Sequence, residues 1–155
     1  MIPFPLPFAK QLAHRGVEEL RFPPGFMDAK SDARWSYAFA WRLDDPAKLD
    51  AAALAGELTA YFRGLLTEVD GDKHRFAPDE IAVRATADGD RFTLTAHIFD
   101  AFGDAAPIDL AGDARRTPCG EGSLWTFVLA PANSARRAQL DTLGGQAACG
   151  QPPVK

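Results

Sequence analysis

The 155-residue sequence has no long apolar run and no excess of basic residues. No stretch approaches the ~18–20 consecutive apolar residues that cross a bilayer, so we expect no membrane span. The 17 Lys and Arg residues are outnumbered by 21 Asp and Glu residues, which gives a formal net charge of −4. Nucleic-acid binding depends mainly on clustered Lys and Arg, so this balance argues against a nucleic-acid partner.

Motifs for phosphate binding and for nucleophilic catalysis are also missing. No Gly-x-Ser-x-Gly motif occurs, and the pair Gly144-Gly145 ends an expected helix, whereas an anion site needs a helix beginning. His14 and His74 stand alone in polar segments without a neighbouring nucleophile, and we expect both to be solvated. No two His residues have the spacing of zinc ligands, so we expect no metal or other cofactor.

Cysteine is scarce, because the chain contains only Cys119, in a Pro-Cys-Gly turn, and Cys149, in an Ala-Cys-Gly turn. Neither lies in an apolar run, where a structural free thiol is usually buried. A bridge would close a loop of about 30 residues and stabilise the fold by roughly 3–4 kcal/mol. A redox pair would need Cys-x-x-Cys spacing, and a metal site would need more ligands. The pattern favours a structural disulfide, with two free thiols as the alternative.

Length and composition are those of one globular domain. Hydrophobic residues make up 46% of the chain and charged residues 25%, and eleven phenylalanines predict an aromatic core. We expect a single domain over residues 1–155, with a loosely packed lead at 1–15 and a tail at 144–155. The lead contains three prolines and no basic residue before its apolar part, which is not typical of a secretory signal.

The stretch RWSYAFAWRL, residues 34–43, places large side chains at every second position. They are Trp35, Tyr37, Phe39, Trp41 and Leu43. A period of two predicts a strand with one aromatic face. The small residues between form a second face, which suits close approach by a packed helix or by a second surface. The aromatic face either packs into the core or lines a ligand pocket. We expect Trp35, at the strand start, to be the most exposed ring.

A long amphipathic helix is expected over residues 46–68. Asp45-Pro46 supplies a cap and a first turn, and Asp50 offers a second start. Apolar residues then recur at spacings of three and four, so they form one stripe that faces the core. The members of this stripe are Leu54, Leu58, Tyr61, Phe62 and Leu65.

The remaining elements complete an α+β fold. The Asp88-Gly89 turn between two alternating runs predicts a β-hairpin over about 81–98. Further strands are expected at 17–22, as an edge strand, at 108–117 and at 123–130. A short C-terminal helix then runs to about Leu143, capped by Asn133 or Ser134. The predicted fold is a single antiparallel sheet of about five or six strands, with the long helix packed across one face.

Several short motifs are spread over most of the chain. They are VEELRFPPG at 17–25, WSYAFAW at 35–41, YFRGL at 61–65 and LAP at 129–131, together with Cys119 and Cys149. In these motifs the chain resembles a family of uncharacterised bacterial proteins that are commonly secreted or envelope-associated. The motifs are structural in type, so no catalytic or binding residue is carried over. The resemblance implies a periplasmic or secreted location, with an export signal removed, and a disulfide between the two cysteines. The alternative location is the cytoplasm.

Three functions are compatible with these features, and the third is an assembly component that uses an exposed strand edge. The first is a non-enzymatic binding module for a protein partner or an apolar small molecule, whose candidate ligand-binding residues are Trp35, Tyr37, Trp41 and His97. The second is a hydrolase-like or metal-assisted enzyme, in which His97 acts with the acidic loop that follows. The carboxylates of that loop are Asp100, Asp104 and Asp109. A simpler interpretation of the same cluster is an exposed strand face and a solvated loop, and we expect no catalytic residue.

Overall fold

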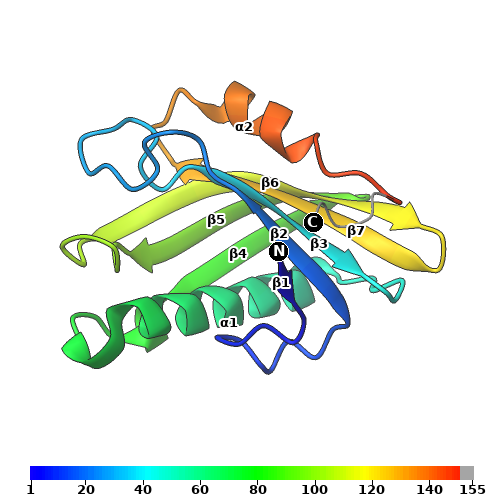
Figure 1. The fold of residues 1–155 in the computed structure, drawn as a ribbon, viewed down its shortest axis with the longest axis horizontal. Helices are drawn as coiled ribbons and strands as arrows, with labels where there is room; N and C mark the ends of the chain where they lie inside the picture. Colours follow the sequence, from blue (N-terminus) through cyan, green and yellow to red (C-terminus); the bar gives the residue numbers. More distant parts are fainter. Residues whose placement is uncertain (151–155) are drawn as a thin grey trace.

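The computed structural model describes residues 1–150 as one seven-stranded antiparallel sheet with a helix on each side (Figure 1). The strands lie in the order β1-β2-β3-β7-β6-β5-β4 across the sheet. They are β1 (Ile2–Pro3), β2 (Gly16–Arg21), β3 (Tyr37–Leu43), β4 (Ala82–Asp88), β5 (Arg91–Phe99), β6 (Pro107–Cys119) and β7 (Gly122–Pro131). The helices are α1 (Ala51–Asp70) and α2 (Arg137–Gly144), with 3-10 turns at η1 (Gly71–Lys73) and η2 (Pro78–Glu80). The α+β class and the single antiparallel sheet are confirmed.

The sheet has one strand more than the five or six predicted, and the additional strand is β1. Ile2 pairs with Glu18, and Pro3 pairs with Val17 on β2. A strand is recognised in a sequence by four or more alternating positions, so a two-residue strand in a proline-rich segment gives no signal. Because of β1, the strand predicted as an edge has a partner along part of that edge.

Every second side chain of β3 points to the face of the sheet that α1 covers, which we call the inner face. Phe39 lies opposite Phe127, and Trp41 lies opposite Trp125 on β7. The ring centroids of Phe39 and Phe127 are 4.4 Å apart, and Tyr61 of α1 stacks on Phe39 at 5.3 Å. All five side chains are buried. The period-two prediction is therefore confirmed over β3, and core packing accounts for most of the aromatic stripe.

Trp35 departs from that prediction in two respects. It precedes β3 with a φ of 57°, a backbone conformation that is uncommon for residues other than glycine. It is also only 1% exposed, although we expected it to be the most exposed ring of the stretch. The rings of Phe26 and Phe102 cover it, with centroids at 5.7 Å and 5.2 Å. Both rings come from distant parts of the sequence, so the local pattern around Trp35 could not indicate its burial.

The long helix begins later than the predicted range of 46–68. Its first residue is Ala51, and the side chain of Asp50 accepts a hydrogen bond from the backbone N–H of Ala53 at 2.7 Å. The second of the two predicted starts is therefore correct. The preceding segment is a loop, and the buried Arg116 donates to two of its backbone carbonyl oxygens at 3.2 and 3.3 Å.

The core-facing stripe of α1 is close to the one predicted. Its fully buried apolar residues are Leu54, Leu58, Tyr61, Phe62 and Leu66. Leu65, which was expected in this set, is only half-buried. Among residues 1–150, no helix is both long and apolar enough to cross a membrane.

The same helix covers part of the free edge of β4. The backbone N–H of Val83 donates to Oγ1 of Thr59 at 3.0 Å. The guanidinium of Arg63 donates to the carbonyl oxygens of Ile81 at 3.2 Å and Asp79 at 3.1 Å. Open strand edges can pair with other chains, so these side chains satisfy backbone groups that would otherwise be available to a second strand.

The second face of β3 carries small residues and receives α2, so of the two alternatives for this face, a packed helix and a second surface, the helix is observed. We call this the outer face, and Figure 1 shows α1 and α2 on opposite sides of the sheet. Ala38 of β3 packs with Val128 and Ala130 of β7 and with Leu140 of α2. After α2, Cys149 forms a disulfide with Cys119 at the end of β6, with the two Cα atoms 5.5 Å apart. The alternative of two free thiols is therefore wrong.

The segment before β2 is packed against α1, which contradicts the loose lead that we expected. Its buried residues are Phe4, Leu6, Ala9 and Leu12. Nε2 of His14 lies 2.8 Å from Oε2 of Glu57 on α1, so His14 is not the solvated side chain that we predicted. The hydrogen bond with Glu57 raises the pKa of His14, and burial opposes this effect.

Two glycines of α1 allow a test of how tightly this lead is packed. A Cβ atom at Gly64 would lie 1.9 Å from the carbonyl oxygen of Phe8, whereas a Cβ at Gly56 would meet nothing within 4 Å. We expect Gly64→Ala to lower the free energy of unfolding by about 1–3 kcal/mol, because the lead must move. Gly56→Ala should raise it by about 0.5–1 kcal/mol. Urea unfolding followed by Trp fluorescence measures both; equal effects of the same sign would contradict the packing described.

The disulfide gives a second prediction. It links positions 30 residues apart. Replacing both Cys119 and Cys149 by Ser should lower the free energy of unfolding by about 3–4 kcal/mol, because the unfolded chain gains the entropy of an open loop. Chemical unfolding of the oxidised protein and of the double variant measures this difference. The native protein under reducing conditions serves as the control and should behave like the variant.

Candidate functional site

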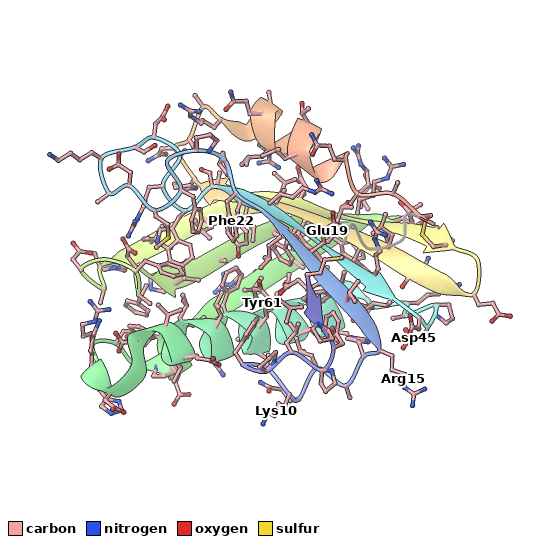
Figure 2. All side chains as sticks on the ribbon, viewed as in Figure 1. Lys10, Arg15, Glu19, Phe22, Asp45 and Tyr61 are labelled. Atoms are coloured by element: carbon pink, nitrogen blue, oxygen red, sulfur yellow. A yellow bond between two sulfur atoms is a disulfide. The ribbon has the colours of Figure 1, made fainter. Side chains whose placement is uncertain are left out.

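A small cavity of about 90 Å³ lies between the inner face of the sheet and α1. Its walls are mainly aromatic. Tyr37 of β3 and Tyr61 of α1 face it, together with Trp35 just before β3. Rings from three loops complete the aromatic wall, namely Phe8, Phe22, Phe26 and Phe102. Tyr61 projects from α1 toward the sheet, and Phe22 follows the end of β2 (Figure 2). The site is thus assembled from segments that are far apart in the sequence.

A larger hollow of about 580 Å³ adjoins this cavity at the surface. The two share Phe22, Phe26 and Phe102, so these rings separate the interior from solvent. Phe22 is 49% exposed and Met27, in the same loop, is 57% exposed. An apolar hollow that opens onto a mainly aromatic cavity is typical of a ligand-binding site. We call the cavity and this hollow the aromatic pocket.

Among residues 1–150, Glu18 is the one charged residue that lines the cavity. Because alternate side chains of β2 share a face, Glu18 and Leu20 both point inward, opposite Trp41 and Phe39 of β3. Glu18 is completely buried. Its Oε1 accepts a hydrogen bond from Nε1 of Trp41 at 3.3 Å, whereas its Oε2 has no hydrogen-bond partner among the described residues.

Burial dominates the electrostatics of this carboxyl group. It raises the pKa of Glu18 from 4.5 to about 6, although the hydrogen-bonding groups of Tyr61 and Trp41 favour the charged form. Burial also raises the pKa values of Tyr37 and Tyr61 well above 10, and the negative charge of Glu18 adds to this effect. At neutral pH the cavity therefore holds one carboxylate beside two neutral phenol groups.

A charged cluster holds one wall of the pocket in place. Oδ1 of Asp100 accepts a hydrogen bond from the indole N–H of Trp35 at 2.9 Å. The guanidinium of Arg34 donates to both carboxylate oxygens of Asp100, at 2.7 and 2.8 Å from Nη2. Asp100 is therefore saturated with hydrogen bonds that fix Trp35, which makes it a structural residue and not a base available to a substrate.

The His97 cluster that we considered as an enzyme site is only partly assembled. Nδ1 of His97 lies 2.8 Å from Oδ1 of Asp109, but both side chains are well exposed on the outer face. Oδ1 of Asp104 accepts a hydrogen bond from the backbone N–H of Ala106 within its own loop, and Asp100 belongs to the Trp35 cluster. Within residues 1–150, no three His, Cys, Asp or Glu side chains are grouped as metal ligands would be.

The four predicted ligand-binding residues therefore lie in three places. Trp35 and Tyr37 line the cavity, Trp41 lies behind it as the hydrogen-bond donor to Glu18, and His97 is on the other face of the sheet. Sequence reasoning missed Glu18. The signal was present, because Glu18 falls in the same period-two set as Leu20 and Phe22, and an acidic residue on an apolar strand face is unusual.

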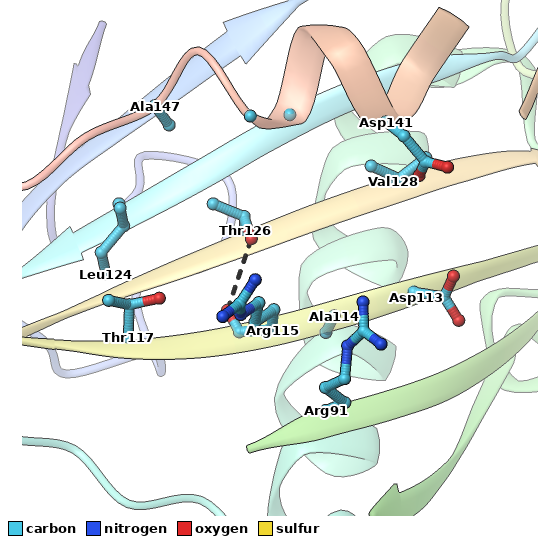
Figure 3. A pocket seen from close by; sticks show the side chains of 12 residues that line it. Arg91, Asp113, Ala114, Arg115, Thr117, Leu124, Thr126, Val128, Asp141 and Ala147 are labelled. Atoms are coloured by element: carbon cyan, nitrogen blue, oxygen red, sulfur yellow. Dashed lines mark hydrogen bonds between the residues drawn. The ribbon is translucent and has the colours of Figure 1, made fainter. Parts of the chain in front are cut away.

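A second hollow lies on the outer face beneath α2 and has a volume of about 450 Å³ (Figure 3). Arg91 and Arg115 extend into it from neighbouring strands, and Asp113 and Asp141 line it as well. Its walls are thus open and of mixed charge. It has neither the apolar enclosure nor the buried charged group of the aromatic pocket, so we regard the aromatic pocket as the candidate site.

Comparisons with known proteins add little to this picture. No protein-family model matches the chain, and no curated protein matches it. Among solved structures, the chain shows a weak similarity to the crystal structure of protein Ms6760 from Mycobacterium smegmatis. The two are 9% identical, with a TM-score of 0.26, over 82% of this chain and 86% of that chain. A similarity of this size supports no inference about function.

The burial of Glu18 predicts a particular dependence of stability on pH. Between pH 4.5 and about 6 the folded state binds more protons than the unfolded state, so the free energy of unfolding should fall as pH rises through this range. The decrease due to Glu18 should be about 2 kcal/mol. Glu18→Gln removes this contribution, so the variant should gain stability relative to the native protein as pH rises from 4 to 7. Urea unfolding at several pH values measures the gain.

The matched control is Glu19→Gln, because Glu19 is the next residue of β2 and points to the outer face, where it pairs with Arg21 and Arg42. Its substitution leaves the carboxyl group of Glu18 in place, so the decrease between pH 4.5 and 6 should remain. If the free energies of unfolding of Glu18→Gln and of the native protein change in parallel between pH 4.5 and 6, the assignment of a raised pKa to Glu18 is wrong.

Proposed function

We propose that this protein is a non-enzymatic binding module that takes up the apolar part of a small molecule in the aromatic pocket. The observation that carries the proposal is an aromatic cavity that extends from an exposed hollow at Phe22 to a buried carboxylate at Glu18. Ligand sites are typically concave and mostly apolar, with few polar groups that orient the ligand. The pocket has each of these properties.

Binding is better supported than catalysis by the side chains available. The described residues that line the cavity include no Ser, Cys, Lys or His that could act as a nucleophile or as a partner base to Glu18. The tyrosine hydroxyl groups are kept neutral by their raised pKa values. The exposed His97 and Asp109 pair supplies a possible proton acceptor, but no pocket encloses it. The enzyme hypothesis therefore has less support than the binding hypothesis.

The size of the pocket favours a small ligand over a protein partner. A cavity of 150 Å³ holds a benzene molecule, so 90 Å³ accommodates a group of about three or four heavy atoms. The remainder of a longer ligand would lie in the surface hollow among Phe22, Phe26 and Met27. The side chain of a protein partner could enter in the same way, but the surrounding hollow is too local to form a standard protein interface.

We place the protein outside the cytoplasm, in the periplasm or secreted. The disulfide between Cys119 and Cys149 supports this proposal, because disulfides persist mainly in oxidising compartments. The resemblance of the chain to a family of secreted and envelope-associated bacterial proteins points the same way. A cytoplasmic protein would need another reason to keep this bond.

The three tryptophans allow a direct test of binding. Trp35 lines the cavity and Trp41 bonds to Glu18, whereas Trp125, opposite Trp41 on β7, is not part of the cavity lining. We expect small lipophilic molecules such as toluene, indole and 1-hexanol to shift the indole N–H resonances of Trp35 and Trp41 in NMR spectra. The resonance of Trp125 should move much less. If no member of the panel at saturating concentration moves the Trp35 resonance, the proposed function is wrong.

A cavity-filling variant and a matched control complete the test. Leu65 is half-buried and lines the cavity, so Leu65→Phe should fill part of it and weaken binding at least tenfold. Leu143 is partly buried on α2, on the other side of the sheet, so Leu143→Phe adds the same atoms away from the pocket. Binding that survives Leu65→Phe unchanged would place the ligand elsewhere.

A further inference from the structure

We propose that the aromatic pocket selects a primary alkylammonium ion with an apolar tail, and that the ammonium group pairs with the carboxylate of Glu18. This inference rests on the proposed binding function and adds the chemical class of the ligand. It depends on three properties of the site, which are the uncompensated charge of Glu18, the aromatic walls and the small volume of the inner cavity.

The charge of Glu18 favours a cationic ligand. The side chain is completely buried, the indole N–H of Trp41 donates to Oε1, and the hydroxyl group of Tyr61 also favours the charged form. Oε2 has no hydrogen-bond partner among the described residues. Lys, Arg and His side chains are absent from the described lining of the cavity. The amino group of Met1 has a weaker effect on Glu18 and does not line the cavity. A buried carboxylate without a counter-ion is costly, so a cation that reaches Oε2 recovers part of that cost.

The hydrogen-bonding groups favour N–H donors in particular. The hydroxyl oxygen of Tyr37 is also buried without a partner at hydrogen-bond distance among the described residues. Tyr37 and Glu18 line the same cavity, so the site offers two acceptor atoms, one of them charged. A primary ammonium has three N–H donors and can serve both. A carboxylate ligand would instead meet the like charge of Glu18, and a neutral alcohol would leave that charge uncompensated.

The aromatic walls stabilise the same kind of group. Cations within about 6 Å of an aromatic ring centre are attracted by the negative face of the ring. Rings from α1, β3 and the loops enclose a cavity of only about 90 Å³, so any group inside it lies close to several of them. Tyr61 and Phe8, for example, form an edge-to-face pair at 5.3 Å. Such walls also accept the methylene groups next to the ammonium.

The volume of the cavity then limits the length of the part of the ligand that carries the ammonium group. Three or four heavy atoms fill 90 Å³, which corresponds to an ammonium nitrogen with two or three carbons. A longer apolar tail would continue past Phe22 and Phe26 into the surface hollow. The expected ligands are therefore simple alkylamines or arylalkylamines and not compact polar amines such as amino acids, whose carboxylate would be placed near Glu18.

The test compares molecules of one length that differ at the polar end. Hexylamine, 1-hexanol, hexanoate and hexyltrimethylammonium are titrated at pH 7.5 against the native protein, Glu18→Gln and Glu19→Gln, with the indole resonances of Trp35 and Trp41 as readouts. Hexylamine should bind the native protein at least tenfold more tightly than hexanol, and hexanoate and hexyltrimethylammonium should bind more weakly than hexylamine. Glu18→Gln should abolish the preference for hexylamine over hexanol, and Glu19→Gln should retain it.

The outcomes separate this inference from the proposed function. Equal binding of hexylamine and hexanol to the native protein would overturn the ammonium assignment and leave the binding function intact. Absence of binding by every probe would overturn both. Tighter binding of hexyltrimethylammonium than of hexylamine would overturn the role of N–H donation. A preference for hexylamine that persists in Glu18→Gln, with an unchanged Trp125 resonance showing an intact fold, would overturn the pairing with Glu18.

Discussion

The stacking of Tyr61 on Phe39 and of Phe39 on Phe127 is the contact on which the rest of the structure depends. It joins the long helix to two adjacent central strands through three parallel rings, with centroid distances of 5.3 and 4.4 Å. Because α1 is held at this point, its next turn carries Gly64 and Leu65 toward the N-terminal lead and the pocket. The position of the cavity is therefore a direct result of how the aromatic core is packed.

The polar residues of the inner face follow from the same arrangement. The inner side chains of β2 lie beside those of β3, so Glu18 is placed against Trp41 and Tyr61 and away from water. Loops then close the space that the sheet and helix leave open, and the bidentate contact between Arg34 and Asp100 holds Trp35 over it. A rigid aromatic layer and a fixed charged cluster together give a cavity whose single carboxylate has a defined position.

Local patterns predicted the regular elements because each of those elements carries its signal in consecutive residues. The alternation of β3, the Asp88-Gly89 hairpin and the stripe of α1 all correspond to observed structure. The pocket could be predicted only in part, since Trp35 and Tyr37 were identified and Glu18 was not. Burial of Trp35 and pairing of β1 each depend on groups distant in sequence, such as Phe102 and Glu18. Neither the cavity nor the hydrogen bonds of Asp100 produce a periodic pattern in the sequence, so neither could be predicted from it.

The walls of the cavity come from the lead, β2, the loop after it, β3, α1 and the loop between β5 and β6. None of these segments forms the space alone, so it exists only when all of them are folded against one another. Any molecule that occupies it therefore stabilises the folded state over every state in which these segments separate. A free ligand concentration of a hundred times the dissociation constant would raise the free energy of unfolding by about 2.7 kcal/mol. The concentration of such a ligand would therefore also set the apparent stability of the folded domain.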